Sequence, residues 1–218
     1  MMRLILYDLD GTLVDTLEDI TASANDMLAA LGLPAVDASS VRGYVGRGVR
    51  ELVKRCLATD DDTQLERGLR LYREHYGRHL LDHSRLYPGA REVLEHFQRL
   101  GRSQAVITNK PDPYSTQILA GLGVAAYFTA IVAGDARYPK KPDPASLRAL
   151  MERHGAAASD TVFIGDSPVD VEAGRRAGVL TVAMTHGLSD AHELDAAAPD
   201  ETVESFAALQ ALAVTQRW

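Results

Sequence analysis

Five short apolar runs rich in β-branched residues are spaced along the chain, and they restrict the folds that it can adopt. The runs lie at residues 4–7, 105–107, 130–133, 162–164 and 181–184. They are too brief and too uniformly apolar for surface helices, so they indicate buried strands. Segments between the later runs have helical spacing, as at Leu147, Leu150 and Met151. Strands that alternate with helices predict an α/β fold with a doubly wound parallel sheet.

The connection between the first two strands is much longer than a parallel crossover requires. About a dozen residues suffice for such a crossover, but 95 positions separate Asp8 from Ser103, and they contain several amphipathic helical patterns. Tyr87-Pro88-Gly89 marks a return to the core, with residues 89–100 as the crossover helix. We therefore expect residues 1–14 and 86–218 to form the α/β core. Residues 15–85 are expected to form an inserted helical cap beside the ligand-binding edge of the sheet.

Polar side chains directly follow three of the predicted strands. Asp8 and Asp10 follow the first strand, Thr108 and Asn109 the second, and Asp166 the fourth. Because the carboxyl ends of parallel strands share one edge of a sheet, these carboxylates are expected to lie close together. Like charges at that distance oppose ionisation unless a cation is present. Oxygen ligands without His or Cys favour a hard ion such as Mg²⁺.

Four segments resemble, in order, the four motifs of the haloacid dehalogenase superfamily. They are Asp8-Leu9-Asp10-Gly11-Thr12-Leu13-Val14, Thr108, Lys141 in Lys141-Pro142-Asp143-Pro144, and Gly165-Asp166-Ser167-x-x-Asp170. The helical insertion after the first motif is similar to the C1-type cap of that superfamily. The resemblance thus extends over the whole chain and implies a Rossmann-like core with a helical cap.

The resemblance also implies a reaction. Asp8 would be the nucleophile that forms an aspartyl-phosphate, and Asp10 would be the general acid and base. Phosphatases and phosphomutases of the superfamily carry this second aspartate, whereas dehalogenases lack it. Asp8, Asp166 and the backbone carbonyl of Asp10 would hold Mg²⁺. Thr108 and Lys141 would bind the phosphoryl oxygens and offset their charge.

Two of these residues have alternative interpretations. Ser167-Pro168-Val169-Asp170 has the pattern of a helix N-terminus. Asp170 is therefore expected either to cap this helix or to support the site, as an indirect partner of the metal or a partner of the lysine. It could also do both. Lys141 has a neighbour, Lys140, which we expect to be solvated, because the position directly before the proline matches the superfamily.

The predicted cap contains a locally basic segment. Residues 42–55 hold five basic residues against one acidic residue. Within it, residues 42–48 are similar to the substrate-facing loop of phosphoglycolate phosphatases, and Thr108-Asn109-Lys110-Pro111 is similar to their second motif. We expect Asn109 to contact substrate, and Arg42 or Arg47 to bind a carboxylate or a second anionic group on it. The alternative is a solvated basic helix face.

Composition excludes several classes of partner. Lys and Arg number 23 against 30 Asp and Glu, for a net charge of −7, which argues against nucleic acid and anionic membranes. Cys56 is the single cysteine, so no intramolecular disulfide can form, and we expect a cytoplasmic protein. The apolar neighbours of Cys56 indicate that this side chain packs in the core. The spacing of His75, His79 and His83 on a predicted helix permits Zn²⁺, but a half-exposed face or subunit contact is the simpler interpretation.

The sequence therefore predicts a Mg²⁺-dependent phosphatase for a small phosphorylated metabolite, most similar to phosphoglycolate phosphatase. The alternatives are a phosphatase for a sugar phosphate, a nucleotide or pyrophosphate, a phosphomutase, and a phospho-receiver module. A receiver needs neither Asp10 nor a cap. Monomer and homodimer both remain open.

Overall fold

A six-stranded parallel sheet forms the centre of the computed structural model, which describes residues 1–135 and 137–218. Its order is β5-β4-β1-β6-β7-β8. The strands are β1 (Leu4–Tyr7), β4 (Ser103–Ile107), β5 (Ala130–Val132), β6 (Thr161–Gly165), β7 (Leu180–Met184) and β8 (Glu201–Val203). The predicted α/β class is confirmed, and each of the five apolar runs contributes a strand. The three-residue strand β8 was not predicted.

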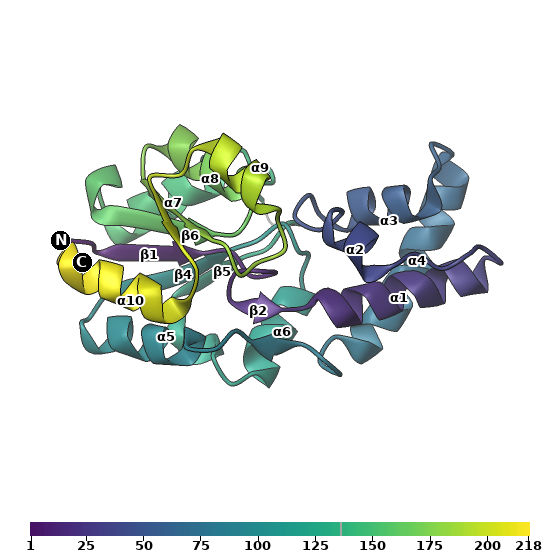
Figure 1. Cartoon of the computed structure of the whole chain (residues 1–218), viewed down its shortest axis with the longest axis horizontal. Coiled ribbons are helices and arrows are strands. Elements are labelled where there is room, and N and C mark those ends of the chain that lie inside the picture. The colour runs from purple at the N-terminus through teal and green to yellow at the C-terminus, as the bar shows by residue number, and fades with distance from the viewer. Residues whose placement is uncertain (136) are drawn as a thin grey trace.

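Helices cover both faces of the sheet, as Figure 1 shows. Ile5 and Tyr7 of β1 belong to the hydrophobic cluster that contains α5 (Ala90–Arg99) and α10 (Phe206–Thr215). Leu4 and Leu6 belong to the cluster that contains residues of α7 (Ala145–His154) and α8 (Pro168–Ala177). Successive side chains of a strand point to opposite faces, so a strand covered on both sides must be apolar throughout. The remaining helical elements beside the sheet are α6 (Tyr114–Gly121), α9 (Ala191–Ala197), η1 (Ala125–Tyr127) and η2 (Ala158–Asp160).

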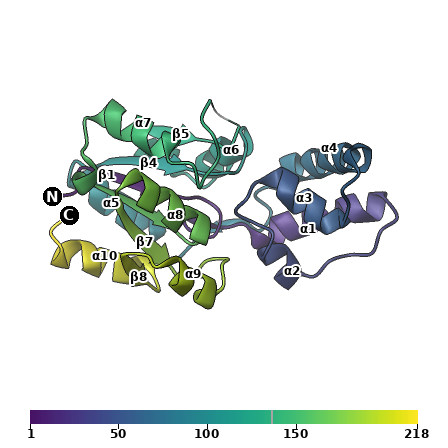
Figure 2. The same cartoon turned by 90° about the horizontal axis from the view of Figure 1, so that it is seen from above.

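A second group of helices lies beyond one end of the sheet (Figure 2). These helices are α1 (Leu17–Ala30), α2 (Ala38–Arg42), α3 (Val49–Leu57) and α4 (Asp62–His79). The chain enters this group through β2 (Val14–Asp15) and leaves it through β3 (Arg85–Leu86), which pair antiparallel. The predicted boundaries of the cap fall within this two-stranded ribbon. Within residues 1–135 and 137–218, no helix combines the length and apolar character needed to cross a bilayer.

A buried carboxylate joins the beginning of α1 to the end of the helical group. Asp19 is 1% exposed, and it accepts hydrogen bonds from the backbone N–H groups of His83 (2.9 Å) and Ser84 (2.8 Å) and from the Ser84 hydroxyl (2.6 Å). Hydrogen bonds to a carboxylate are stronger than neutral ones. Asp19 thus fixes the path of the chain just before it returns to the core.

The three histidines do not share one helix, so that prediction is wrong for His83. Helix α4 ends at His79, and His83 lies in the segment that follows it. The His75 and His79 rings stack, with 4.3 Å between their centroids. Their polar partners differ: His75 contacts Ser23 Oγ at 3.0 Å and lies 3.6 Å from the Asp26 carboxylate, and His79 and His83 each contact a different carboxylate. In the described part of the chain, the side chains that cluster closely enough to bind a metal ion are three aspartates outside the helical group, and no histidine is among them.

Candidate active site

Three aspartates meet at the carboxyl edge of the sheet. Asp8 directly follows β1, Asp166 directly follows the neighbouring strand β6, and Asp170 lies in the first turn of α8. One carboxylate oxygen of each lies within 4.8 Å of the others. All three residues are buried, with at most 5% of their surface exposed. The parallel pairing of β1 and β6 brings Asp8 and Asp166 together, as the strand ends predicted. The third carboxylate of the cluster comes from Asp170 in α8 and not, as expected, from Asp10.

Backbone and hydroxyl groups hold the Asp166 carboxylate in place. Its Oδ1 accepts a hydrogen bond from Thr12 Oγ1 at 2.9 Å, and its Oδ2 accepts one from the backbone N–H of Leu188 at 2.7 Å. Gly11 has a φ of +83°, and a Cβ there would lie 2.1 Å from Asp166 Oδ2. Glycine is therefore required at position 11, both for the backbone conformation and for the close approach to Asp166.

Lys141 joins two of the three aspartates. Its Nζ lies 2.7 Å from Asp8 Oδ1 and 2.7 Å from Asp170 Oδ1. The other carboxylate oxygen of Asp170 accepts hydrogen bonds from the Ser167 backbone N–H (3.1 Å) and hydroxyl (2.5 Å), which completes a capping box at the start of α8. Asp170 therefore contacts both the helix N-terminus and the lysine, two of the roles that its sequence pattern left open.

The site carries more negative than positive charge. Burial raises the pKa of Asp8 to about 7, the charge of Asp170 adds to this effect, and Lys141 opposes it. Burial also raises the pKa of Asp166 well above its usual value, and the charges of Asp170 and Asp8 add to it. Burial favours the neutral form of Lys141, but Asp170 and Asp8 outweigh it and raise the lysine pKa to about 12. A buried all-oxygen cluster with excess negative charge fits a hard divalent cation such as Mg²⁺.

The Asp10 side chain has different partners from those of Asp8. Its Oδ1 accepts hydrogen bonds from Thr16 Oγ1 at 2.7 Å and from Lys110 Nζ at 2.9 Å, and Lys110 also lies 3.2 Å from Oδ2. Lys110 is 7% exposed. No functional role was predicted for Lys110 or Thr16. The position of Lys110 two residues after the strand-end Thr108 was the available signal.

The residues after β4 are also buried, and they bridge distant segments. Thr108 is 4% exposed, and its hydroxyl accepts a hydrogen bond from the Lys110 backbone N–H at 3.1 Å. Asn109 donates to the carbonyls of Gly46 (2.8 Å) and Lys141 (3.0 Å) and accepts from the Lys141 N–H (2.9 Å). Asn109 therefore connects the helical group to the lysine segment.

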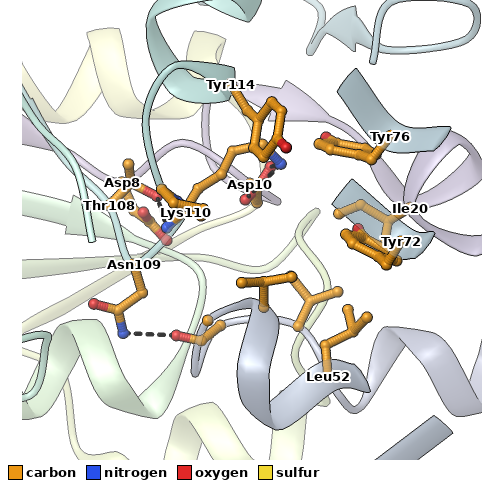
Figure 3. Close-up of a pocket in the computed structure, with 15 residues that line it drawn as sticks. Asp8, Asp10, Ile20, Leu52, Tyr72, Tyr76, Thr108, Asn109, Lys110 and Tyr114 are labelled. Atoms are coloured by element: carbon orange, nitrogen blue, oxygen red, sulfur yellow. Dashed lines mark hydrogen bonds and ion pairs between the residues drawn. The ribbon is translucent and has the colours of Figure 1, made fainter. Parts of the chain in front are cut away.

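A pocket of about 40 Å³ lies between these core residues and the helical group. Asp8, Asp10, Thr108 and Lys110 line its core side. Figure 3 shows the opposite side, formed by side chains of α1, α3 and α4. The lining residues on that side are Ile20, Val45, Gly46, Gly48, Val49, Leu52, Tyr72 and Tyr76. Charged groups of the core thus face a mostly apolar wall.

The two arginines that were predicted to bind substrate lie outside this pocket. Arg42 and Arg47 line a second cleft of about 650 Å³, between the helical group and the loop after β7. Arg42 Nη1 donates a hydrogen bond to the Gly187 carbonyl at 3.1 Å. Neither arginine lines the pocket that contains Asp8 and Asp10.

Comparison with known proteins agrees with this geometry. A family model described as haloacid dehalogenase-like hydrolase matches residues 5–184. The chain belongs to the haloacid dehalogenase-like hydrolase family. The resemblance inferred from the four motifs is confirmed, and the α/β fold is the one that its relatives in this family adopt.

Relatives within this family are similar over most of their length. A phosphoglycolate phosphatase from Pseudomonas syringae pv. syringae is 41% identical over 191 residues, which cover 85% of this chain and 70% of that protein. One from Vibrio parahaemolyticus is 37% identical, with coverage of 95% and 94%. A crystal structure from Haemophilus somnus, described as a predicted phosphoglycolate phosphatase, superposes with a TM-score of 0.92 at 30% identity and covers 97% of both chains.

Proposed function

We propose that this protein is a Mg²⁺-dependent phosphatase that hydrolyses phosphoglycolate, or an equally small phosphomonoester, through an aspartyl-phosphate. The observation that carries the proposal is the placement of Asp8. Its buried carboxylate lies beside Lys141 and Asp166 and lines the same small pocket as Asp10. The names of the relatives support phosphoglycolate as the substrate.

In the first step, a carboxylate oxygen of Asp8 forms a bond to phosphorus while the bond from phosphorus to the ester oxygen breaks. Asp10 gives its proton to the departing oxygen. Thr108 and Lys141 bind the phosphoryl oxygens and stabilise the charge that develops on them. In the second step, Asp10 removes a proton from water, whose oxygen bonds to phosphorus and releases Asp8.

Asp8, Asp166 and the backbone carbonyl of Asp10 would hold Mg²⁺. Burial raises the pKa values of Asp8 and Asp166, and repulsion from neighbouring carboxylates raises them further. A divalent cation would offset both effects, which supports this assignment. When bound, the ion supplies charge neutralisation at the phosphoryl oxygens. Asp170 supports the site indirectly, since it contacts Lys141 and caps α8.

We also propose that residues 15–85 act as the cap that selects substrates by size. A space of about 40 Å³ has room for only a few water-sized groups. That size suits a leaving group such as glycolate, whereas a sugar or a nucleoside would require the helical group to move away. The apolar wall formed by α1, α3 and α4 would keep bulk water from the phosphoenzyme.

Phosphate release from a panel of esters tests the proposal. We expect the largest kcat/KM for phosphoglycolate, smaller values for a hexose phosphate, a nucleoside monophosphate and pyrophosphate, and no release in EDTA. Asp8→Asn should lower release by at least about a thousandfold, as loss of a nucleophile does in other enzymes. Asp195→Asn is the control, because Asp195 is exposed on α9.

Two results would contradict the proposal. Equal activity in Asp8→Asn and Asp195→Asn would remove Asp8 from the reaction. A single stoichiometric phosphorylation without release of phosphate would instead indicate a receiver module.

A further inference from the structure

Lys110 is a buried cation to which the proposed reaction assigns no role. It lies three residues beyond the end of β4, and its Nζ is 2.9 Å from Asp10 Oδ1. The Nζ also lies 4.6 Å from the centre of the Tyr76 ring, within the range of a cation–π contact. The ammonium therefore sits between the acid of the proposed reaction and the wall formed by α4, as Figure 3 shows.

Lys110 differs from every other described residue that lines this pocket. The charged lining residues are Asp8, Asp10 and Lys110, so among the described residues Lys110 is the sole cation of the lining. Arg42 and Arg47 line the separate cleft near Gly187. An anionic group that enters the pocket beyond Asp10 can therefore pair with one positive charge of the described lining, the ammonium of Lys110.

The ammonium of Lys110 can bind a second anionic group while it keeps its contact with Asp10. A buried ammonium is costly without a counter-charge, and Asp10 supplies that charge in the structure. An ammonium has three N–H donors. A carboxylate on the leaving group can therefore accept a further hydrogen bond from Nζ beside Asp10.

The distances suit a carboxylate one carbon from the ester oxygen. That oxygen must be within hydrogen-bond distance of Asp10, and Lys110 Nζ is already 2.9 Å from Asp10. Because Nζ also lies 3.2 Å from Asp10 Oδ2, an atom that forms a hydrogen bond of about 2.9 Å with either oxygen lies within roughly 6 Å of Nζ. A single methylene between the ester oxygen and a carboxylate spans much of that gap and leaves room for a hydrogen bond to Nζ.

We propose that Lys110 binds a carboxylate on the leaving group and thereby selects phosphoglycolate over neutral esters of the same size. The inference rests on the proposed function, because it places the leaving group beside Asp10. It assigns substrate specificity to the segment after β4 and not to the basic segment at residues 42–55.

The test compares phosphoglycolate with 2-hydroxyethyl phosphate, which replaces the carboxylate by a neutral hydroxymethyl group. The measured quantity is the ratio of the two kcat/KM values in wild type, Lys110→Met, Lys110→Arg and Arg47→Met. Leaving-group reactivity cancels when this ratio is compared between variants. An aryl phosphate serves as a substrate that measures phosphatase activity independently of the carboxylate.

Lys110→Met should lower the ratio about 10- to 100-fold, the range expected for loss of a hydrogen bond to a charged group. Much of the change should appear in KM for phosphoglycolate. Lys110→Arg should keep most of the preference because it retains the positive charge, and Arg47→Met should change both substrates by the same factor. The Lys110→Arg result keeps the test decisive if Lys110→Met folds poorly.

Four results would overturn the inference. An equal loss on both substrates in Lys110→Met would show that Lys110 acts only through Asp10. A change of the ratio in Arg47→Met alone would assign the carboxylate to the basic segment. If the wild type releases no phosphate from any of the three substrates, the proposed function and this inference are both overturned. If it hydrolyses the aryl phosphate but shows no preference for phosphoglycolate, only this inference is overturned.

Discussion

Lys141 places its ammonium between two of the three buried carboxylates, 2.7 Å from each. The raised pKa of Lys141, about 12, keeps it charged over the whole neutral range, so its stabilising contribution is lost only as pH rises toward that value. Asp8 behaves in the opposite way. Its pKa in the folded protein, about 7, lies above the ordinary 3.8, so its ionisation costs stability as pH rises between these values.

Replacement of Lys141 by methionine should therefore destabilise the metal-free protein in a pH-dependent way. We expect Lys141→Met to lower the free energy of unfolding by about 3–5 kcal/mol at pH 8, the usual cost of leaving a buried charge unpaired. At pH 5.5 the loss should be smaller, because a carboxyl group of the cluster can take up a proton. Urea denaturation in EDTA at both pH values measures the effect.

The adjacent lysine provides the control for this prediction. Lys140 is exposed, so Lys140→Met should change stability by no more than about 0.5 kcal/mol at either pH. A loss of similar size in both variants, or one that is larger at pH 5.5 than at pH 8, would contradict the role given to Lys141.

Some contacts of the site could be predicted from the sequence, and others could not. Asp8 and Asp166 could be placed together because parallel topology brings strand ends to one edge of a sheet. The contacts of Lys110 with Asp10 and of Leu188 with Asp166 could not be predicted, since they depend on the paths of a side chain and of a loop. Sequence spacing places Lys110 near the end of a strand, but it does not determine where the Lys110 side chain or the loop of Leu188 lies.

Helix α4 packs closely against α1 and α3 at a glycine, Gly68. Gly68 is buried, and a Cβ there would lie 2.7 Å from Leu57 Cδ1, 3.1 Å from Val53 Cγ1 and 3.3 Å from Met27 Sδ. Glycine in a helix interior costs about 1 kcal/mol relative to alanine. Close approach of three helices explains why α4 carries glycine at this position.

Two glycines of α4 should therefore respond differently to alanine. Gly68→Ala should lower stability by about 1–2 kcal/mol, because overpacking of a core exceeds the gain in helix propensity. Gly77→Ala should leave stability unchanged or raise it by up to about 1 kcal/mol. Gly77 is exposed, and its added Cβ would meet Tyr114 Cε1 at an ordinary 3.4 Å. Urea denaturation of both variants checks this, and equal stabilisation by both would contradict the packing described for α4.

The elements also differ in how well the sequence reveals them. The central strands are covered on both faces, so each is an apolar run that the sequence displays. Strand β8 has three residues at the edge of the sheet, with Glu201 half-buried and Thr202 exposed. The two-residue strands β2 and β3 pair where the chain leaves and rejoins the core. Such short strands depend on tertiary contacts and leave no periodic pattern.

Hydrogen bonds between segments that are distant in the sequence join the helical group to the core. Asn109 donates to the Gly46 carbonyl, Arg42 to the Gly187 carbonyl, and the Tyr114 hydroxyl to the Arg73 carbonyl at 3.2 Å. The long insertion after the first strand was visible in the sequence. Its contacts with the core were not, because they depend on how two separately packed groups of elements meet.

The proposed reaction requires that Asp8 becomes phosphorylated. The most direct measurement is acid quenching of Asp10→Asn after incubation with Mg²⁺ and an aryl phosphate, followed by peptide mass spectrometry. An aryl leaving group needs little help from an acid, whereas water attack lacks its base, so the intermediate should accumulate. We predict about one phosphoryl group per chain, on Asp8, and none in the Asp8→Asn variant. Phosphate release without phosphorylation of Asp8, or a phosphoryl group on another residue, would contradict the proposed reaction.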